Sequence, residues 1–129
     1  MGDPVVHFEI IGEDPAELRG YYGDLFGWRF TVGDATTDKV SPPGTYGFAE
    51  GAGINGGVGG GAGHRPAVLF YVGVPDVEAA LAKAEALGGR RLLGPEPATG
   101  DFTVGRFADP EGNVIGVAGP AADPTAGPA

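Results

Sequence analysis

The stretch VVHFEIIGEDPAELRGYYGDLFGWRF, residues 5 to 30, has a counterpart later in the chain, VLFYVGVPDVEAALAKAEALGGRRL, residues 68 to 92. The two align without a gap when His7 is placed on Leu69, a shift of 69 − 7 = 62 residues. Among the identical residues that the same shift brings together are Asp14 with Asp76, Leu25 with Leu87, Gly27 with Gly89, and Arg29 with Arg91. The chain is therefore predicted to contain two copies of one module.

Each copy begins with a short run of β-branched and aromatic residues, which is typical of a strand. Apolar residues at a spacing of three and four then predict one face of a helix. These residues are Leu18, Tyr22 and Leu25 in the first copy and Val77, Leu81, Ala84 and Leu87 in the second. Asp14 before Pro15, and Asp76, are expected to cap the helix N-termini, and Gly27 and the pair Gly88 and Gly89 the C-termini.

Three further strand candidates follow each predicted helix. They are WRFTV, TYGFAE and GINGGV in the first copy and RRLLG, FTVGRFA and NVIGVA in the second. The predicted fold is α+β, with two βαβββ modules forming a concave mixed sheet. One domain over residues 1–119 is expected, with module one at about 4–56, a glycine-rich linker at about 57–66, module two at about 67–118, and a disordered tail at 120–129.

The charge of the chain excludes several classes of partner. Seventeen acidic and eight basic residues give a formal net charge of −9, which disfavours binding to nucleic acid or to an anionic membrane surface. There is no cysteine, so any metal would have to be held by His, Asp or Glu. No signal-peptide pattern or long apolar run is seen, and a cytoplasmic location is expected.

Two glycine-containing motifs have simple structural interpretations. GAGING, residues 51 to 56, matches the letters of a dinucleotide-binding motif, but more glycine and then Pro66 follow it, where that motif needs a helix. DPEGN, residues 109 to 113, is spaced like the start of a calcium loop, yet Pro120 stands where the bidentate carboxylate belongs. We interpret the second motif as a hairpin turn.

The paired modules, together with HFEI (7–10), YYGDLFGW (21–28), GGRRLLGP (88–95) and FADPEGNVIGVA (107–118), resemble the vicinal oxygen chelate superfamily. That superfamily includes glyoxalase I, extradiol dioxygenases and bleomycin-resistance proteins. The resemblance implies a divalent metal held by the first and last strands of each module. His7 matches one ligand position, whereas Leu69 and Gly116 occupy two others and Asn55 is a weak candidate for the fourth. No metal and no other cofactor is therefore expected.

The resemblance also implies which side chains face the cavity. Val5, His7, Glu9 and Ile11 are expected to face it from the first strand, with Val6, Phe8 and Ile10 packed on the helices. The residues expected to contact a ligand are His7, Glu9, Leu69, Tyr71, Tyr46, Phe48, Asn55 and Arg106. Ordinary core packing is the simpler interpretation of each aromatic among Trp28, Tyr46, Phe48 and Phe107, and it is favoured for Trp28.

The leading functional hypothesis is a homodimeric binding protein of the bleomycin-resistance type. It would sequester a planar or aromatic molecule, such as an antibiotic or another natural product, without catalysis. One alternative is a metal-dependent enzyme of the glyoxalase or dioxygenase kind that uses His7 and Glu9. A second alternative is a protein-interaction subunit with a vestigial cavity.

Overall fold

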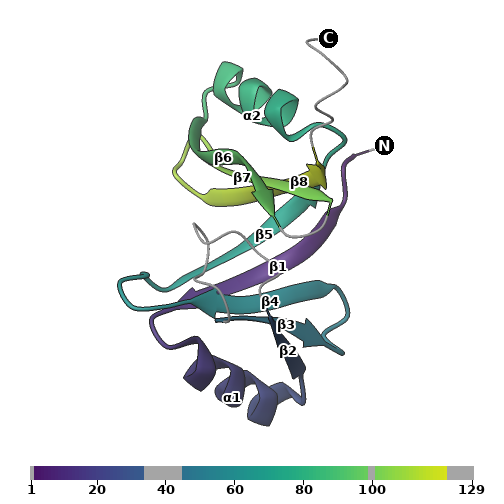
Figure 1. The fold of residues 1–129 in the computed structure, drawn as a ribbon. Helices are drawn as coiled ribbons and strands as arrows, with labels where there is room; N and C mark the ends of the chain where they lie inside the picture. The colour runs from purple at the N-terminus through teal and green to yellow at the C-terminus, as the bar shows by residue number, and fades with distance from the viewer. Residues whose placement is uncertain (1, 34–44, 99–100, 122–129) are drawn as a thin grey trace.

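The computed structural model describes residues 2–33, 45–98 and 101–121, and its elements follow the order βαβββ twice (Figure 1). Module one comprises β1 (Val5–Gly12), α1 (Pro15–Phe26), β2 (Arg29–Gly33), β3 (Tyr46–Glu50) and β4 (Asn55–Gly60). Module two comprises β5 (Ala67–Gly73), α2 (Val77–Ala86), β6 (Arg90–Ala98), β7 (Phe102–Ala108) and β8 (Val114–Pro120). The predicted fold class is confirmed.

All the strands join one mixed sheet in the order β2-β3-β4-β1-β5-β8-β7-β6. β1 runs parallel to β4 and β5 runs parallel to β8, while β1 and β5 are antiparallel at the centre. Phe8 pairs with Phe70 in this central ladder, and Phe70 is also the residue that the 62-residue shift places on Phe8. The internal repeat therefore corresponds to two halves related about the β1–β5 pair.

The helices lie at opposite ends of the molecule, each beside the strands of its own module (Figure 1). Asp14 Oδ1 accepts the Glu17 N–H at 3.1 Å, and Asp76 Oδ1 accepts the Ala79 N–H at 3.0 Å. Gly27 ends α1 in the left-handed region with φ = 75°, which a residue without Cβ adopts at little cost. The predicted caps of both helix N-termini and of the α1 C-terminus are confirmed.

The predicted apolar helix faces are only partly buried. α2 packs Val77 and Leu81 against Val117 of β8, whereas the side chain of Leu87 is 72% exposed and lies after the helix. In α1 the expected contact of Leu25 is wrong, because that side chain is 55% exposed. Tyr22 instead stacks on Trp28, which also packs on Phe8 of β1.

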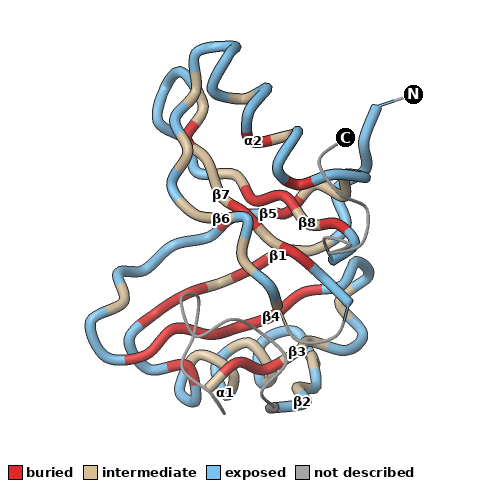
Figure 2. Tube along the Cα trace, turned by 45° about the horizontal axis from the view of Figure 1, so that its top comes forward, coloured by how far each residue is buried: buried red, intermediate tan, exposed pale blue. Residues whose placement is uncertain are grey.

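The first part of the linker expected at residues 57–66 is strand. Gly57–Gly60 continue β4 alongside β1 and are buried, so the connection between the modules begins at Gly61 and the linker expected at 57–66 is shorter (Figure 2). Two glycines of β4 have no room for a side chain: a Cβ on Gly56 would overlap the ring of Phe8, and a Cβ on Gly57 would overlap the ring of Tyr46. GAGING leads into a strand, as predicted.

DPEGN forms the hairpin between β7 and β8, as predicted. Asp109 Oδ1 accepts the N–H groups of Glu111 and Asn113, both at 2.9 Å. Pro120 still belongs to β8, whereas residues 122–129 of the expected tail lie outside the described part of the chain. Neither α1 nor α2, the helices of the described residues, is long and apolar enough to cross a membrane.

Candidate functional site

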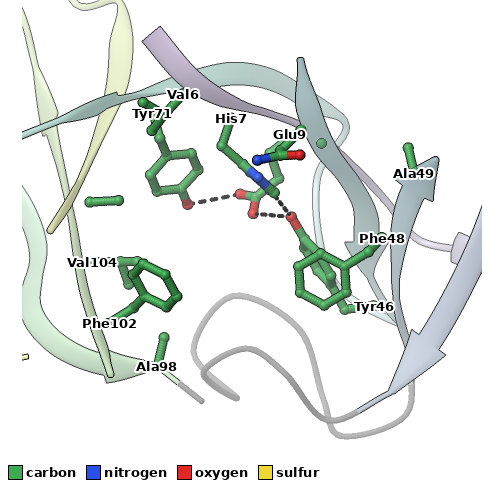
Figure 3. Close-up of a pocket in the computed structure, with 13 residues that line it drawn as sticks. Val6, His7, Glu9, Tyr46, Phe48, Ala49, Tyr71, Ala98, Phe102 and Val104 are labelled. Atoms are coloured by element: carbon green, nitrogen blue, oxygen red, sulfur yellow. Dashed lines mark hydrogen bonds between the residues drawn. The ribbon is translucent and has the colours of Figure 1, made fainter. Parts of the chain in front are cut away.

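A cavity of about 350 Å³ lies on the inner face of the sheet. Figure 3 shows Tyr71, Phe102 and Val104 on one wall and Tyr46 and Phe48 on the other, with His7 and Glu9 between them. The full lining comprises Val6, His7, Glu9, Tyr46, Phe48, Ala49, Asn55, Gly56, Tyr71, Ala98, Phe102, Val104 and Ala118. Most of the lining is apolar or aromatic, as is usual for a small-molecule pocket.

Glu9 is the most deeply buried charged residue of the described chain, with 3% of its surface exposed. Its Oε2 accepts a hydrogen bond from the Tyr46 hydroxyl at 2.9 Å, and its Oε1 accepts one from the Tyr71 hydroxyl at 3.0 Å. Arg106 Nη2 also donates to Oε1 and forms a salt bridge. A buried carboxylate is tolerated only when it is paired and hydrogen-bonded, and here both oxygens are engaged.

Arg106 and Tyr71 extend this network across module two. Arg106 Nε donates to the Tyr71 hydroxyl oxygen at 3.1 Å, while that hydroxyl donates its proton to Glu9. β1 and β7, which carry Glu9 and Arg106, belong to different modules. The salt bridge therefore joins the two halves of the molecule beneath the cavity.

The two phenols of the network remain protonated. Burial raises the pKa of Tyr46 well above its ordinary value, and the charge of Glu9 and the hydrogen bond to it raise it further. Burial, followed by the charge of Glu9, also raises the pKa of Tyr71. Both hydroxyls are therefore hydrogen-bond donors to the carboxylate at every physiological pH.

His7 joins the network at its edge. Its Nε2 lies 2.8 Å from the Tyr46 hydroxyl, and its ring is surrounded by the rings of Tyr46, Phe48 and Tyr71 at centroid distances of 5.8–6.4 Å. Burial lowers the pKa of His7, which favours the neutral imidazole near pH 7.

Two glycines make room for the phenol rings. Gly57 pairs with Glu9 across β1 and β4, and a Cβ there would overlap the ring of Tyr46. Gly116 pairs with Tyr71 across β5 and β8, and a Cβ there would overlap the Tyr71 ring. The position on β8 where the resemblance implies a metal ligand is thus covered by an aromatic ring of the chain itself.

The residues present do not fit a divalent metal. A protein site for such an ion needs at least three donors. Among residues 2–33, 45–98 and 101–121 there is no group of three His, Cys, Asp or Glu side chains that could hold one. His7 and Glu9 are already bonded to Tyr46.

The structure brings six of the eight expected ligand residues to the cavity: His7, Glu9, Tyr46, Phe48, Asn55 and Tyr71. The other two lie beside it. Leu69 is buried next to Glu9 in the β1–β5 ladder and does not line the cavity. Arg106 reaches the network from β7 without forming part of the cavity lining.

The start of the first strand departs from the expectation in two ways: Val6 lines the cavity, and Val5 does not. The ladder between β1 and β5 has an irregularity between Val5 and His7, which breaks the strict alternation of side chains. Val6 lines the cavity as a result, although it was expected to pack on the helices. Farther along the strand the expected alternation holds: Ile11 packs with Tyr46, while Phe8 packs with Trp28 on the other face.

The sequence analysis did not find Ala98, Phe102, Val104 or Ala118, which form the apolar wall of module two. A signal was present, because Phe102 and Val104 alternate with Arg106 along one strand and so share its face. Ala118 similarly shares the face of Gly116 on β8.

A family model described as a glyoxalase-like domain matches residues 7–118, most of the chain. The chain belongs to the glyoxalase-like domain family. This assignment confirms the resemblance to the vicinal oxygen chelate superfamily. A search of curated proteins finds no significant match to this glyoxalase-like domain.

Solved structures agree on the fold. A hypothetical protein, BH1468 from Bacillus halodurans C-125, matches with a TM-score of 0.69 and 11% identity over 95% of this chain and 98% of that chain. Methylmalonyl-CoA epimerase from Mycobacterium tuberculosis matches with a TM-score of 0.66 and 16% identity over 95% and 91%. A glyoxalase/bleomycin resistance protein/dioxygenase superfamily member from Vibrio splendidus 12B01 matches with a TM-score of 0.56 and 18% identity over 92% and 99%. At these identities the likeness establishes the fold alone.

Proposed function

We propose that this glyoxalase-like domain binds a planar or aromatic small molecule without a metal and releases it unchanged, in the manner of a bleomycin-resistance protein. The observation that carries the proposal is the hydrogen bonding of the Glu9 carboxylate. Its two oxygens accept hydrogen bonds from Tyr46, Tyr71 and Arg106, so the carboxylate has little remaining capacity to take a proton or to hold a metal.

The composition and size of the cavity support the same proposal. Phe48, Phe102 and Tyr71 present aromatic surface, and Val104 and Ala118 add aliphatic surface. A volume of about 350 Å³ lies at the lower end of the range for small-molecule pockets and suits a compact ring system. Each ring that stacks on or meets the edge of a ligand ring contributes about 1 kcal/mol beyond the area that it buries.

A second candidate function is proton transfer by His7. The imidazole is neutral and its Nε2 contacts a phenol that is bonded to Glu9, an arrangement that can orient a general base. One structural neighbour is an epimerase by name, but the low identity transfers no activity. This candidate differs from the first in a single measurable property, which is the appearance of product.

The test is a screen of planar aromatic compounds by thermal shift and ligand-detected NMR, followed by mass spectrometry of the recovered compound. Fluorescence of Trp28 is a poor reporter, because this residue packs against Phe8 and Tyr22 on the other face of the sheet. We expect compounds that stabilise the protein and are recovered unchanged after prolonged incubation.

Two variants make the screen specific for the cavity. Ala118→Phe places a ring in the cavity and should abolish binding, whereas Ala82→Phe makes the same change at an exposed site on α2 and should leave it intact. Product formed by the wild type but not by a His7→Phe variant would support the proton-transfer candidate instead. Equal binding by Ala118→Phe and the wild type would contradict a role for this cavity.

A further inference from the structure

Two polar groups of the cavity keep hydrogen-bonding capacity that the internal network does not use. Glu9, Tyr46 and Tyr71 bond to one another or to Arg106. His7 bonds through one ring nitrogen only, and within the described residues neither its Nδ1 nor the Asn55 amide has a protein partner in the structure. A ligand in the cavity can therefore form hydrogen bonds with the side chains of His7 and Asn55.

The network determines which nitrogen of His7 carries the proton. The Tyr46 hydroxyl has a single hydrogen, and it donates this hydrogen to the carboxylate of Glu9. The 2.8 Å contact between His7 Nε2 and the same oxygen must then use a hydrogen from the imidazole. Because burial keeps the ring neutral, Nε2 bears that proton and Nδ1 is left as an acceptor.

Asn55 lies beside His7. His7 and Asn55 are register partners in the parallel ladder of β1 and β4, where neighbouring strands lie about 4.8 Å apart and paired side chains share one face. Both residues line the cavity. The glycines that follow Asn55 in β4, Gly56 and Gly57, offer no side chain to compete for its amide. Its Nδ2 can therefore donate beside the Nδ1 acceptor.

We propose that the cavity selects a neutral planar ring whose edge carries an N–H next to a C=O, as in a cyclic amide fused to an aromatic ring. The ligand N–H donates to His7 Nδ1, and its carbonyl accepts from Asn55 Nδ2. The rings of Phe48 and Phe102 contact the remainder of the molecule. This assignment rests on the proposed binding function and names the chemical class of its ligand.

The charges around the site favour a neutral ligand over an anion. Glu9 is a buried carboxylate whose one cationic partner is Arg106, and the chain as a whole carries a formal charge of −9. A neutral His7 offers a lone pair, which repels a carboxylate or a phenolate. A simple phenol has one oxygen for both contacts, whereas a cyclic amide places its donor and its acceptor on neighbouring atoms, one for His7 and one for Asn55.

The test compares matched probes by isothermal titration calorimetry. Quinolin-2(1H)-one carries the N–H and the carbonyl, 1-methylquinolin-2-one lacks the donor, and naphthalene lacks both the donor and the acceptor. A polar group left unpaired on binding costs enough to reduce affinity about tenfold, so the wild type should prefer quinolin-2(1H)-one to its N-methyl form by about that factor. His7→Phe should remove the preference, and Asn55→Leu should weaken binding of both carbonyl compounds while leaving binding of naphthalene unchanged.

Failure of this inference is distinguishable from failure of the proposed function. Equal affinity of the wild type for the N–H and N-methyl probes, or a preference that survives His7→Phe, would overturn the cyclic-amide assignment. The same holds if none of the three probes binds while other planar aromatics do. If no planar aromatic compound binds at all, the proposed function falls and this inference falls with it.

A measurement without ligand tests the underlying tautomer. The chain has two histidines, so the ¹⁵N NMR spectrum of labelled imidazoles is simple, and His7→Phe identifies the His7 signals. We expect the Nε2–H tautomer in the wild type and loss of this fixed tautomer in Tyr46→Phe. An Nδ1–H tautomer in the wild type would overturn the proposal, because the cavity would then present a donor in place of an acceptor.

Discussion

The two modules share one backbone plan but place different chemistry at equivalent positions. On the central strands, His7 and Glu9 of module one correspond to Leu69 and Tyr71 of module two under the 62-residue shift. The ladders repeat this correspondence, since Glu9 pairs with Gly57 as Tyr71 pairs with Gly116. A symmetric metal site would need donors in both halves, whereas here the polar groups lie mainly in module one.

Module two contributes one essential charge at a position that is apolar in module one. Arg106 pairs with Gly116 on β8, and Phe48 pairs with Gly57 on β4, so the two side chains are structural equivalents. Arg106 neutralises Glu9 across the centre of the sheet. The comparison shows that the two halves share one backbone plan, while a salt bridge and two phenols that the halves supply unequally occupy the centre of the sheet.

Breaking the salt bridge between Arg106 and Glu9 should have the largest effect on stability. Arg106→Leu leaves Glu9 buried without its cation, which should lower the free energy of unfolding by about 3–5 kcal/mol in urea denaturation. Glu9→Gln combined with Arg106→Leu should recover part of this loss, because no unpaired charge remains. A loss below about 1 kcal/mol for Arg106→Leu would show that the salt bridge does not join the modules.

The glycine that accommodates Tyr71 should be the next most sensitive position. Gly116→Ala forces the Tyr71 ring to move and should cost about 1–3 kcal/mol of stability, measured by thermal or urea unfolding. Gly20→Ala is the matched control, because its Cβ meets open space on α1 and alanine is the better helix former by about 1 kcal/mol. Equal effects of the two substitutions would contradict the close packing of Tyr71 on β8.

The helix N-terminal caps are alike in the two modules, so removing either one should lower the stability of the protein equally. Asp14→Ala and Asp76→Ala each remove the side-chain acceptor at a helix N-terminus, and each should cost about 1 kcal/mol. The two values should agree to within a few tenths of a kcal/mol in the same urea experiment. A loss confined to one variant would show that the helices are not equivalent parts of the repeat.

Protonation of His7 should have the smallest effect on folding stability, and the direction of that effect with pH can be stated. Burial lowers its pKa in the folded state, while the unfolded chain takes up a proton near pH 6.5, so the stability contributed by the neutral ring falls as the pH drops through that value. The difference in stability between wild type and His7→Phe, measured from pH 7.5 to 6, should therefore shift against the wild type on acidification. The groups that face His7 are Tyr46, Tyr71 and Glu9, with Arg106 behind them. A shift in favour of the wild type would mean that the negative charge of Glu9 holds a proton on His7.

The fold could be predicted from the sequence because its signals are local and occur twice. The caps Asp14 and Asp76, the strand patterns and the repeat at a fixed shift all agree with one another. The length of β4 was missed because glycine normally interrupts strands, and only the rings of Phe8 and Tyr46 explain why Gly56 and Gly57 lie inside one.

The site could be predicted only as a set of residues. The resemblance to the vicinal oxygen chelate superfamily identified six cavity residues, but the Val5–His7 irregularity that turns Val6 inward has no sequence signal that we recognise. The contacts between Glu9 and Arg106, 97 residues apart, depend on the three-dimensional arrangement of the modules. The homodimer and the cytoplasmic location stay predictions.

The central claim has two parts. Tyr46, Tyr71 and Arg106 occupy the oxygens of Glu9, so the cavity does not hold a metal, and its aromatic lining binds an aromatic molecule instead. A native mass spectrum, recorded after incubation with an aromatic compound from the screen and with zinc, nickel and manganese salts followed by dialysis, tests both parts at once. We expect one intact aromatic molecule per chain in the wild type, none in Ala118→Phe, and no stoichiometric divalent ion. One divalent ion per chain in the wild type, lost in His7→Ala, would contradict the account.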